Sequence, residues 1–199
     1  MQAQDGAACG HGGMGKADTD LGVVADRVRG LLELLARVIE TDSGEVLAER
    51  DNPRDSFAGH VLETPWDELQ LAYFAGYAMW TYLTEPFSFT MPGFETEEVT
   101  PWEEDGQTWR RLKVTFPDDI ATHSKEQTFY IGSDGLIKRH DYDAEVVAGG
   151  PAAHYPSEYR EFDGIMIPTK RRVYPLAEDG TANRDLLLVS IDLDGITLE

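Results

Sequence analysis

The spacing of hydrophobic positions changes along the chain, and each spacing predicts a different element. From Leu21 to Ile39, apolar residues recur every three or four positions with charged residues between them, which is the pattern of an amphipathic helix. We expect it to start near Thr19 or Asp20, either of which can cap the first turn, and to end at "TDSG", residues 41–44. Because its polar face carries both signs of charge, packing on a core is favoured over binding to a membrane or a partner helix.

A second helix is predicted over residues 65–85, within "TPWDELQLAYFAGYAMWTYLTEP". Thr64 can cap it, Pro65 suits its first position and Pro86 ends it. The helix is apolar around most of its circumference, so it must be covered on more than one side. Its rings are expected either to be core or, on a sharper hypothesis, to line a ligand cavity. The candidate ligand-binding residues are Trp66, Tyr73, Tyr77, Trp80 and Tyr82.

After Pro86 the apolar residues alternate with polar ones, as in strands with one buried face. Four Asp-Gly dipeptides, at residues 105–106, 134–135, 163–164 and 179–180, separate the strand-like runs and predict hairpin turns. The predicted fold class is therefore α+β: a curved antiparallel sheet, arranged as a half-barrel meander, wraps around the aromatic helix, and the amphipathic helix precedes it.

A chain of 199 residues with 41% hydrophobic content can bury one sizeable core. We expect a flexible Gly-rich tail over residues 1–18 and a single domain over 19–199. Within that domain, 19–43 hold the amphipathic helix and 44–199 hold the half-barrel sheet together with the aromatic helix.

The formal net charge of -20 argues against a nucleic-acid partner, because nucleic-acid binding requires a positive surface. No run of the sequence approaches the ~20 apolar residues of a membrane span. The first residues show no secretion signal, so the sequence predicts a cytoplasmic protein. The single cysteine, Cys9, excludes an internal disulfide and lacks the neighbours that would activate a thiol.

Two strands carry a pattern that resembles a known family. One reads Gly135, Leu136, Arg139, Asp141 and Tyr142; the next reads Tyr159, Phe162, Gly164, Ile165, Ile167, Pro168 and Thr169. This pattern is similar to that of the lipoprotein-carrier and lipid-binding half-barrels of the LolA and LppX type. The resemblance covers roughly residues 44–198, and its motifs are structural rather than catalytic.

The resemblance implies a concave apolar sheet able to hold an acyl chain or another hydrophobic small molecule or lipid. It implies no chemistry and no cofactor, and it indicates no particular protein partner. Such carriers are exported, whereas this sequence shows no signal. They also place strands before the aromatic helix, where this sequence has its amphipathic helix.

The best catalytic candidates are His140 and Tyr142, within "KRHDYD". In a strand both side chains point to one face, so they could act as base and acid on a small substrate, although hydrogen-bonded core groups are the commoner case. Arg139 and Asp141 point to the opposite face and are expected to pair with residues 170–172 of a neighbouring strand. No two histidines have the helical spacing of a zinc site, so no metal site is predicted.

Two hypotheses of function therefore remain open. The first is a binding module that holds a hydrophobic small molecule or acyl chain in the concave face. The second is a cofactor-free enzyme on the same scaffold that uses His140 and Tyr142. They differ in one observable property, because an enzyme requires titratable groups that reach the reacting atom of a bound substrate.

Overall fold

The computed structural model describes residues 38–40 and 45–197, which form one α-helix, three 3-10 turns and nine strands. The helical segments are η1 (Pro53–Phe57), α2 (Glu68–Thr84), η2 (Phe87–Thr90) and η3 (Glu145–Val147). The strands are β1 (Val38–Glu40), β2 (Val46–Glu49), β3 (Glu95–Glu104), β4 (Gln107–Thr115), β5 (Glu126–Ile131), β6 (Ile137–Asp143), β7 (Pro151–Phe162), β8 (Ile165–Pro175) and β9 (Val189–Asp192).

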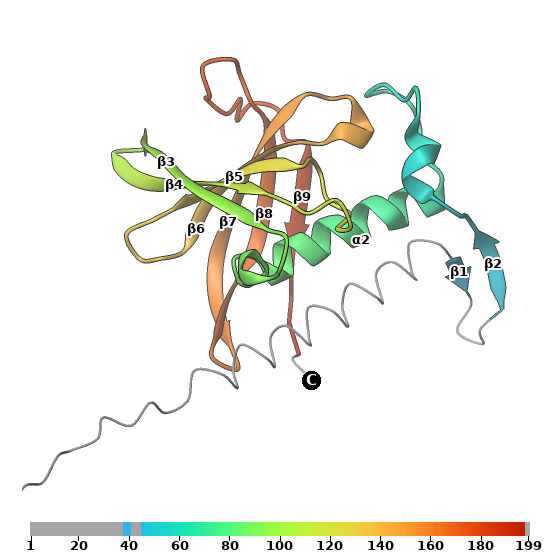
Figure 1. Cartoon of the computed structure of the whole chain (residues 1–199), viewed down its shortest axis with the longest axis horizontal. Coiled ribbons are helices and arrows are strands. Elements are labelled where there is room, and N and C mark those ends of the chain that lie inside the picture. Colours follow the sequence, from blue (N-terminus) through green and yellow to red (C-terminus); the bar gives the residue numbers. More distant parts are fainter. Residues whose placement is uncertain (1–37, 41–44, 198–199) are drawn as a thin grey trace, which may run out of the picture.

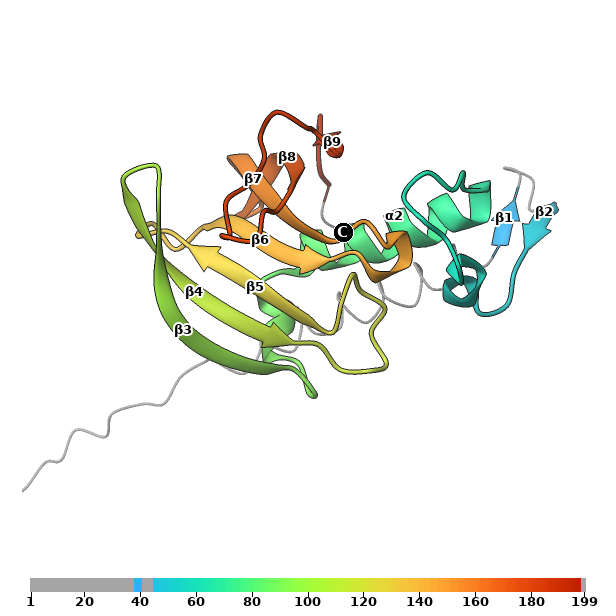
Figure 2. The same ribbon diagram turned by 90° about the horizontal axis from the view of Figure 1, so that it is seen from above.

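Strands β3 to β9 form a seven-stranded sheet in which every neighbour in space is also the neighbour in sequence. All pairs are antiparallel. The sheet is not closed, since β3 and β9 are its two edges, and helix α2 runs across one of its faces (Figures 1 and 2). The predicted α+β half-barrel meander is confirmed.

The Asp-Gly dipeptides make the turns that the sequence predicted in three of four cases. Residues 105–106, 134–135 and 163–164 lie between β3 and β4, β5 and β6, and β7 and β8. Both residues of the first and third have positive φ, the backbone of a type I′ hairpin turn. The fourth, Asp179-Gly180, instead tightens the long connection between β8 and β9, where Leu176 bridges Ala182.

Helix α2 begins later than predicted. Its N-cap is Asp67, whose carboxylate accepts a hydrogen bond from the Gln70 backbone at 2.8 Å, while the Gln70 side chain accepts one from the Asp67 backbone at 3.0 Å. This reciprocal capping box satisfies two backbone donors at the start of the helix. The Thr64 hydroxyl instead accepts a hydrogen bond from the Val61 backbone at 3.0 Å, so Thr64 and Pro65 precede the helix. The helix ends at Thr84, and Glu85 is its C-cap.

The aromatic helix packs into the concave face of the sheet. Its residues Tyr73, Tyr77, Ala78 and Tyr82 share one core cluster with Tyr142, Val146, Ala152 and Val173 of the sheet side. Trp80 joins a second cluster with Val114, Phe116, Ile120, Phe129 and Ile137. The prediction that the sheet covers this helix is therefore confirmed, and its rings supply much of the core.

The predicted N-terminal amphipathic helix is wrong in its last residues. Val38–Glu40 is a strand that pairs antiparallel with Val46–Glu49, in a hairpin set apart from the main sheet (Figure 1). Val38 and Ile39 are β-branched and favour a strand once a partner is present, and a helical spacing of apolar residues does not reveal that partner. The remainder of the predicted helix, and the tail over residues 1–18, lie outside the described residues.

Candidate functional site

The five rings predicted to bind a ligand lie on the helix side of the sheet, but they have different surroundings. Tyr73, Tyr77, Trp80 and Tyr82 are all buried. Trp66 lies just before the helix, with its ring centroid 5.2 Å from that of Phe57 and 4.9 Å from that of Phe74. Of the five, Tyr73 lines a pocket.

This pocket has a volume of about 390 Å³ and lies where η1 and α2 meet the segment between β4 and β5. Tyr73, Phe116, Ile120 and Ala121 supply its apolar wall. Its rim is charged: Arg54 pairs with Glu145 at 2.6 Å, and Lys125 pairs with Asp118 at 2.6 Å. Both pairs are exposed to solvent, so each contributes little to stability and leaves the rim groups accessible.

His140 and Tyr142 point to the concave face, as predicted, but both are buried and neither lines the pocket. His140 Nε2 lies 2.6 Å from Gln127 Oε1, and the Gln127 amide nitrogen donates to Thr122 Oγ1. Because the Gln127 amide nitrogen faces Thr122, its oxygen Oε1 faces His140. An amide oxygen only accepts hydrogen bonds, so the proton of the neutral imidazole is assigned to Nε2. Burial holds the pKa of His140 well below its ordinary value.

A second set of buried polar groups surrounds Tyr82. Its hydroxyl lies 2.8 Å from that of Tyr142 and 3.0 Å from Nε2 of His123. The His123 and Tyr142 rings stack with centroids 3.9 Å apart. Burial, followed by the charge of Arg54, lowers the pKa of His123 to about 3, so this imidazole is neutral at physiological pH. No sequence pattern indicates a role for His123, because it lies in a segment between two strands.

Glu85 and Arg171 form the charged part of this interior. Glu85 caps the C-terminus of α2, Arg171 comes from β8, and both side chains are buried. Arg171 Nη1 lies 3.4 Å from Glu85 Oε1 and 3.4 Å from His154 Nε2, while Nη2 donates to the Tyr82 carbonyl at 2.6 Å. Burial raises the pKa of Glu85 to about 7, against the opposing effect of Arg171. Only the fold brings these two residues together, since they are 86 positions apart.

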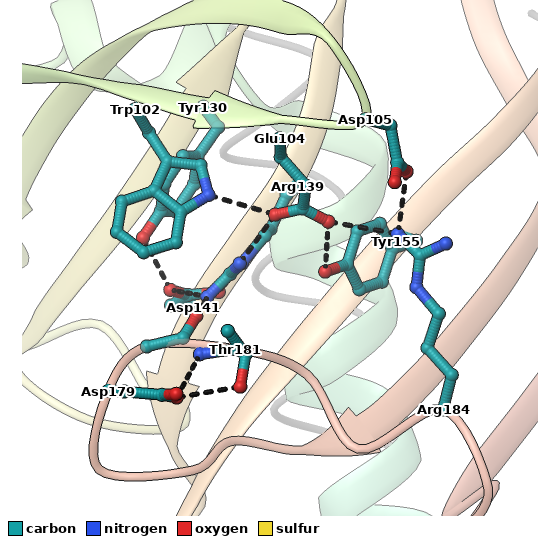
Figure 3. Close-up of polar contacts among 11 residues, drawn as sticks. Trp102, Glu104, Asp105, Tyr130, Arg139, Asp141, Tyr155, Asp179, Thr181 and Arg184 are labelled. Atoms are coloured by element: carbon teal, nitrogen blue, oxygen red, sulfur yellow. Dashed lines mark hydrogen bonds and ion pairs between the residues drawn. The ribbon is translucent and has the colours of Figure 1, made fainter.

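The opposite face of the sheet carries a polar cluster around Arg139, shown in Figure 3. The Arg139 guanidinium donates to both oxygens of Asp141, at 2.6 and 2.8 Å, and to Glu104 at 2.7 Å. Its Cζ lies 5.4 Å from the ring centroid of Trp102 and 4.7 Å from that of Tyr130. The predicted pairing of Arg139 and Asp141 with residues 170–172 is wrong.

The physical reason for that error is the strand order, because β7 lies between β6, which carries Arg139 and Asp141, and β8, which carries residues 170–172. Arg171 points to the concave face, where it meets Glu85. Its neighbours Lys170 and Arg172 pair with Glu158 at 2.6 Å and with Asp192 at 2.7 Å. By alternation, Lys170 and Arg172 lie on the same face as Arg139 and Asp141, but cross-strand pairs form between neighbouring strands and β7 separates these residues.

The connection between β8 and β9 covers the Arg139 cluster from outside. The Gly180 carbonyl accepts a hydrogen bond from Arg139 Nη2 at 2.7 Å. Arg184 donates to Glu104 at 2.9 Å and to Asp105 at 3.0 Å (Figure 3). Burial opposes ionisation of Glu104, but hydrogen bonds from Tyr155, Trp102 and Arg139 hold its pKa below the ordinary value. The charged groups of this cluster pair with one another, which indicates that the cluster stabilises the fold.

Within residues 38–40 and 45–197, no three His, Cys, Asp or Glu side chains are grouped in a way that could hold a metal ion. Among the helices of that same part of the chain, none has the length and apolar character needed to cross a membrane. Cys9 lies outside the described residues.

No family model matches the chain, and no curated protein matches it. Three solved structures are similar. A LolA superfamily protein from Nitrosomonas europaea shares 17% identity over 46% of this chain and 41% of its own length, with a TM-score of 0.35. A DUF1329 family protein from Desulfovibrio piger shares 24% over 41% of this chain and 34% of its own, with a TM-score of 0.32.

The third structure is a domain from Vibrio parahaemolyticus named for outer membrane lipoprotein sorting, with 11% identity over 79% of this chain and 60% of its own length and a TM-score of 0.41. The chain thus spans from 34% to 60% of the structures that it matches. The likeness to LolA-type proteins suggested by the sequence is confirmed as a structural likeness. At these identities it carries no conclusion about activity.

Proposed function

We propose that the protein binds a hydrophobic small molecule or an acyl chain on the concave side of its half-barrel. The observation that carries this proposal is the pocket of about 390 Å³ with an apolar wall made by Tyr73, Phe116, Ile120 and Ala121. Its volume falls within the range of about 300 to 1,000 Å³ typical of small-molecule sites. Polar and charged side chains make up the rest of its lining.

The aromatic helix has two parts in this proposal. Tyr73 contacts the ligand directly, because it lines the pocket. Tyr77 lies behind it, with ring centroids 5.3 Å apart, and holds its ring in place. Trp66, Trp80 and Tyr82 support the wall through the core instead of reaching the pocket, and they become contacts only for a ligand that extends further along the concave face.

The enzyme hypothesis has less support from the geometry. His140 and Tyr142 are buried away from the pocket wall, whereas a general acid or base must come within hydrogen-bond reach of the substrate. Both have partners of their own, in Gln127 and Tyr82. We therefore assign them to the interior hydrogen-bond network.

Native mass spectrometry of the purified protein, followed by organic extraction, tests the proposal. We expect a hydrophobic molecule to bind or to copurify, and Ala121→Trp to reduce binding strongly, because the new ring occupies the pocket. Ala177→Trp is the matched control, since Ala177 is exposed in the connection between β8 and β9. A protein that binds no hydrophobic probe, or an Ala121→Trp variant that binds like the control, contradicts the proposal.

Two further predictions from the sequence stay predictions. One is the single domain over residues 19–199 after a tail over 1–18. The other is a cytoplasmic location, which the likeness to LolA-type carriers opposes, since that likeness implies export. Fractionation of the native host distinguishes the two locations.

A further inference from the structure

The buried guanidinium of Arg171 lies over the Tyr82 ring, with Cζ 4.8 Å from the ring centroid, but its hydrogen bonding is incomplete. It is fully buried on the concave face, and arginine keeps its charge in proteins. Its one short hydrogen bond runs to the Tyr82 carbonyl at 2.6 Å, while its contacts with Glu85 and His154 are both 3.4 Å long. Its Nε has no hydrogen-bond partner among the described residues. A carboxylate satisfies a planar guanidinium with two parallel hydrogen bonds.

Glu85 is a weak counter-ion for this charge. Its Oε2 also has no hydrogen-bond partner in the described part of the chain and lies 3.7 Å from Nδ1 of His140. The residue sits at the C-cap of α2, where the negative end of the helix dipole disfavours a carboxylate. The backbone of α2 therefore fixes the acid in a position from which it meets Arg171 only loosely.

We infer that Arg171 is the binding site for the carboxylate of an amphiphilic ligand, and that Glu85 covers this site until such a ligand replaces it. The inference rests on the proposed function and names its ligand class: a carboxylic acid with a hydrophobic chain. A free carboxylate can align with the planar guanidinium and make two hydrogen bonds, which the tethered Glu85 does not.

A continuous set of side chains joins the pocket to this site. Thr122 lines the pocket and accepts a hydrogen bond from Gln127 at 2.6 Å, and Gln127 in turn contacts His140 at 2.6 Å. His140 stacks on Phe129 with centroids 4.0 Å apart, and Phe129 belongs to the same core cluster as Phe116 of the pocket wall. These side chains are themselves buried and fill the space between the pocket and Arg171. A ligand whose chain lies on the apolar wall therefore places its head group on the guanidinium only when they and the side chain of Glu85 move aside.

A structural role for the Glu85–Arg171 pair makes the opposite prediction. If the pair only fastens α2 to the sheet, replacing Glu85 leaves a buried charge uncompensated and creates no preference among ligands. If Arg171 is a carboxylate site, the same replacement removes the competitor. The two roles therefore differ in head-group preference, which does not depend on how much stability the variant loses.

The experiment compares hexadecanoic acid with hexadecan-1-ol, which share a chain and differ in charge. For Glu85→Gln we expect the affinity for the acid to rise at least about tenfold relative to the parent, while the affinity for the alcohol is unchanged. One charge-assisted hydrogen bond is sufficient for a tenfold gain in affinity. The acid should also raise the melting temperature of this variant more than the alcohol does. Glu158→Gln, which removes an exposed partner of Lys170, is the matched control and should behave like the parent.

Arg171→Lys keeps the charge and loses the planar fork, and we expect it to lose most of the preference for the acid. Equal relative affinity of acid and alcohol in the parent and in Glu85→Gln overturns the inference and leaves the proposed function standing. Failure of all variants to bind either molecule overturns both. An acid preference that is unchanged in Arg171→Met, which removes the charge, assigns the carboxylate to another group and also overturns the inference.

Discussion

Arg139 and Asp141, two positions apart on β6, form a bidentate ion pair on the convex face, with N–O distances of 2.6 and 2.8 Å. Residues two apart on a strand share a face, so this pair is local, and the fold adds Glu104 from β3 and the Gly180 carbonyl. Both residues belong to the pattern that carried the family resemblance. Their role here is to tie β3, β6 and the connection between β8 and β9 together.

Arg139→Met should cost about 3–5 kcal/mol of unfolding free energy, because it leaves Glu104 and Asp141 mostly buried without their shared cation. Denaturant unfolding measures this loss. Arg110→Met is the control, since Arg110 pairs with Glu98 on the exposed surface and should cost less than about 1 kcal/mol. Similar losses in the two variants would show that the convex cluster contributes no more than a surface pair.

Gly180→Ala should loosen the connection between β8 and β9. Gly180 has φ of 83°, and a Cβ there would lie 3.0 Å from the Trp102 ring. Gly135 has a similar φ of 78° with nothing within 4 Å of its Cβ position, so Gly135→Ala carries the backbone strain alone, of order 1–3 kcal/mol. We expect faster hydrogen exchange of residues 176–188 in Gly180→Ala only. The same exchange in both variants would mean that contact with Trp102 does not hold this segment.

Acidification should destabilise the protein below about pH 6.5, the ordinary pKa of histidine. Burial lowers the pKa of His123, His140 and His154, so each of these groups binds its proton only in the unfolded state over this range. Stability therefore falls as the pH falls, by about 1.4 kcal/mol per pH unit for each such group.

Glu85 acts in the opposite direction, because burial raises its pKa to about 7 from an ordinary value of 4.5. The folded state binds this proton between those values, so the stability that Glu85 contributes is complete below pH 4.5 and is lost as the pH rises through 7. Glu85→Gln should therefore steepen the acid dependence between pH 4.5 and 6.5. A fitted slope that is flat, or unchanged by this substitution, would show that these groups do not titrate as their burial implies.

Trp80→Ala should cost about 3–5 kcal/mol, since Trp80 is 2% exposed and packs into the second core cluster with Phe129. Leu83→Ala, on the same helix with Leu83 39% exposed, should cost less than about 1 kcal/mol. Thermal or chemical unfolding distinguishes the two. Equal losses would contradict the orientation of α2 on the sheet.

The antiparallel meander can be predicted from the sequence alone. Alternating apolar residues set which side of each strand is buried, and the Asp-Gly turns set the hairpins, because both act between residues close in sequence. The same logic placed His140 and Tyr142 on one face and Arg139 and Asp141 on the other, and placed an aromatic helix before the sheet. The local pattern predicted the wrong structure at Val38–Glu40, where apolar residues at helical spacing form a strand because a partner strand pairs with them.

Which side chains come into contact depends instead on how the whole chain folds. Sheet order, register and the position of α2 bring Glu85 to Arg171 and Glu104 to Arg139. The local sequence around these residues predicts none of these three features. The fold also buries Tyr77, Trp80 and Tyr82 in the core and leaves Trp66 half-buried. It places Tyr73 both in a core cluster and on the pocket wall. The physical reason is that burial and pairing depend on what packs against a side chain from distant parts of the chain, while periodicity reports only the face on which that side chain lies.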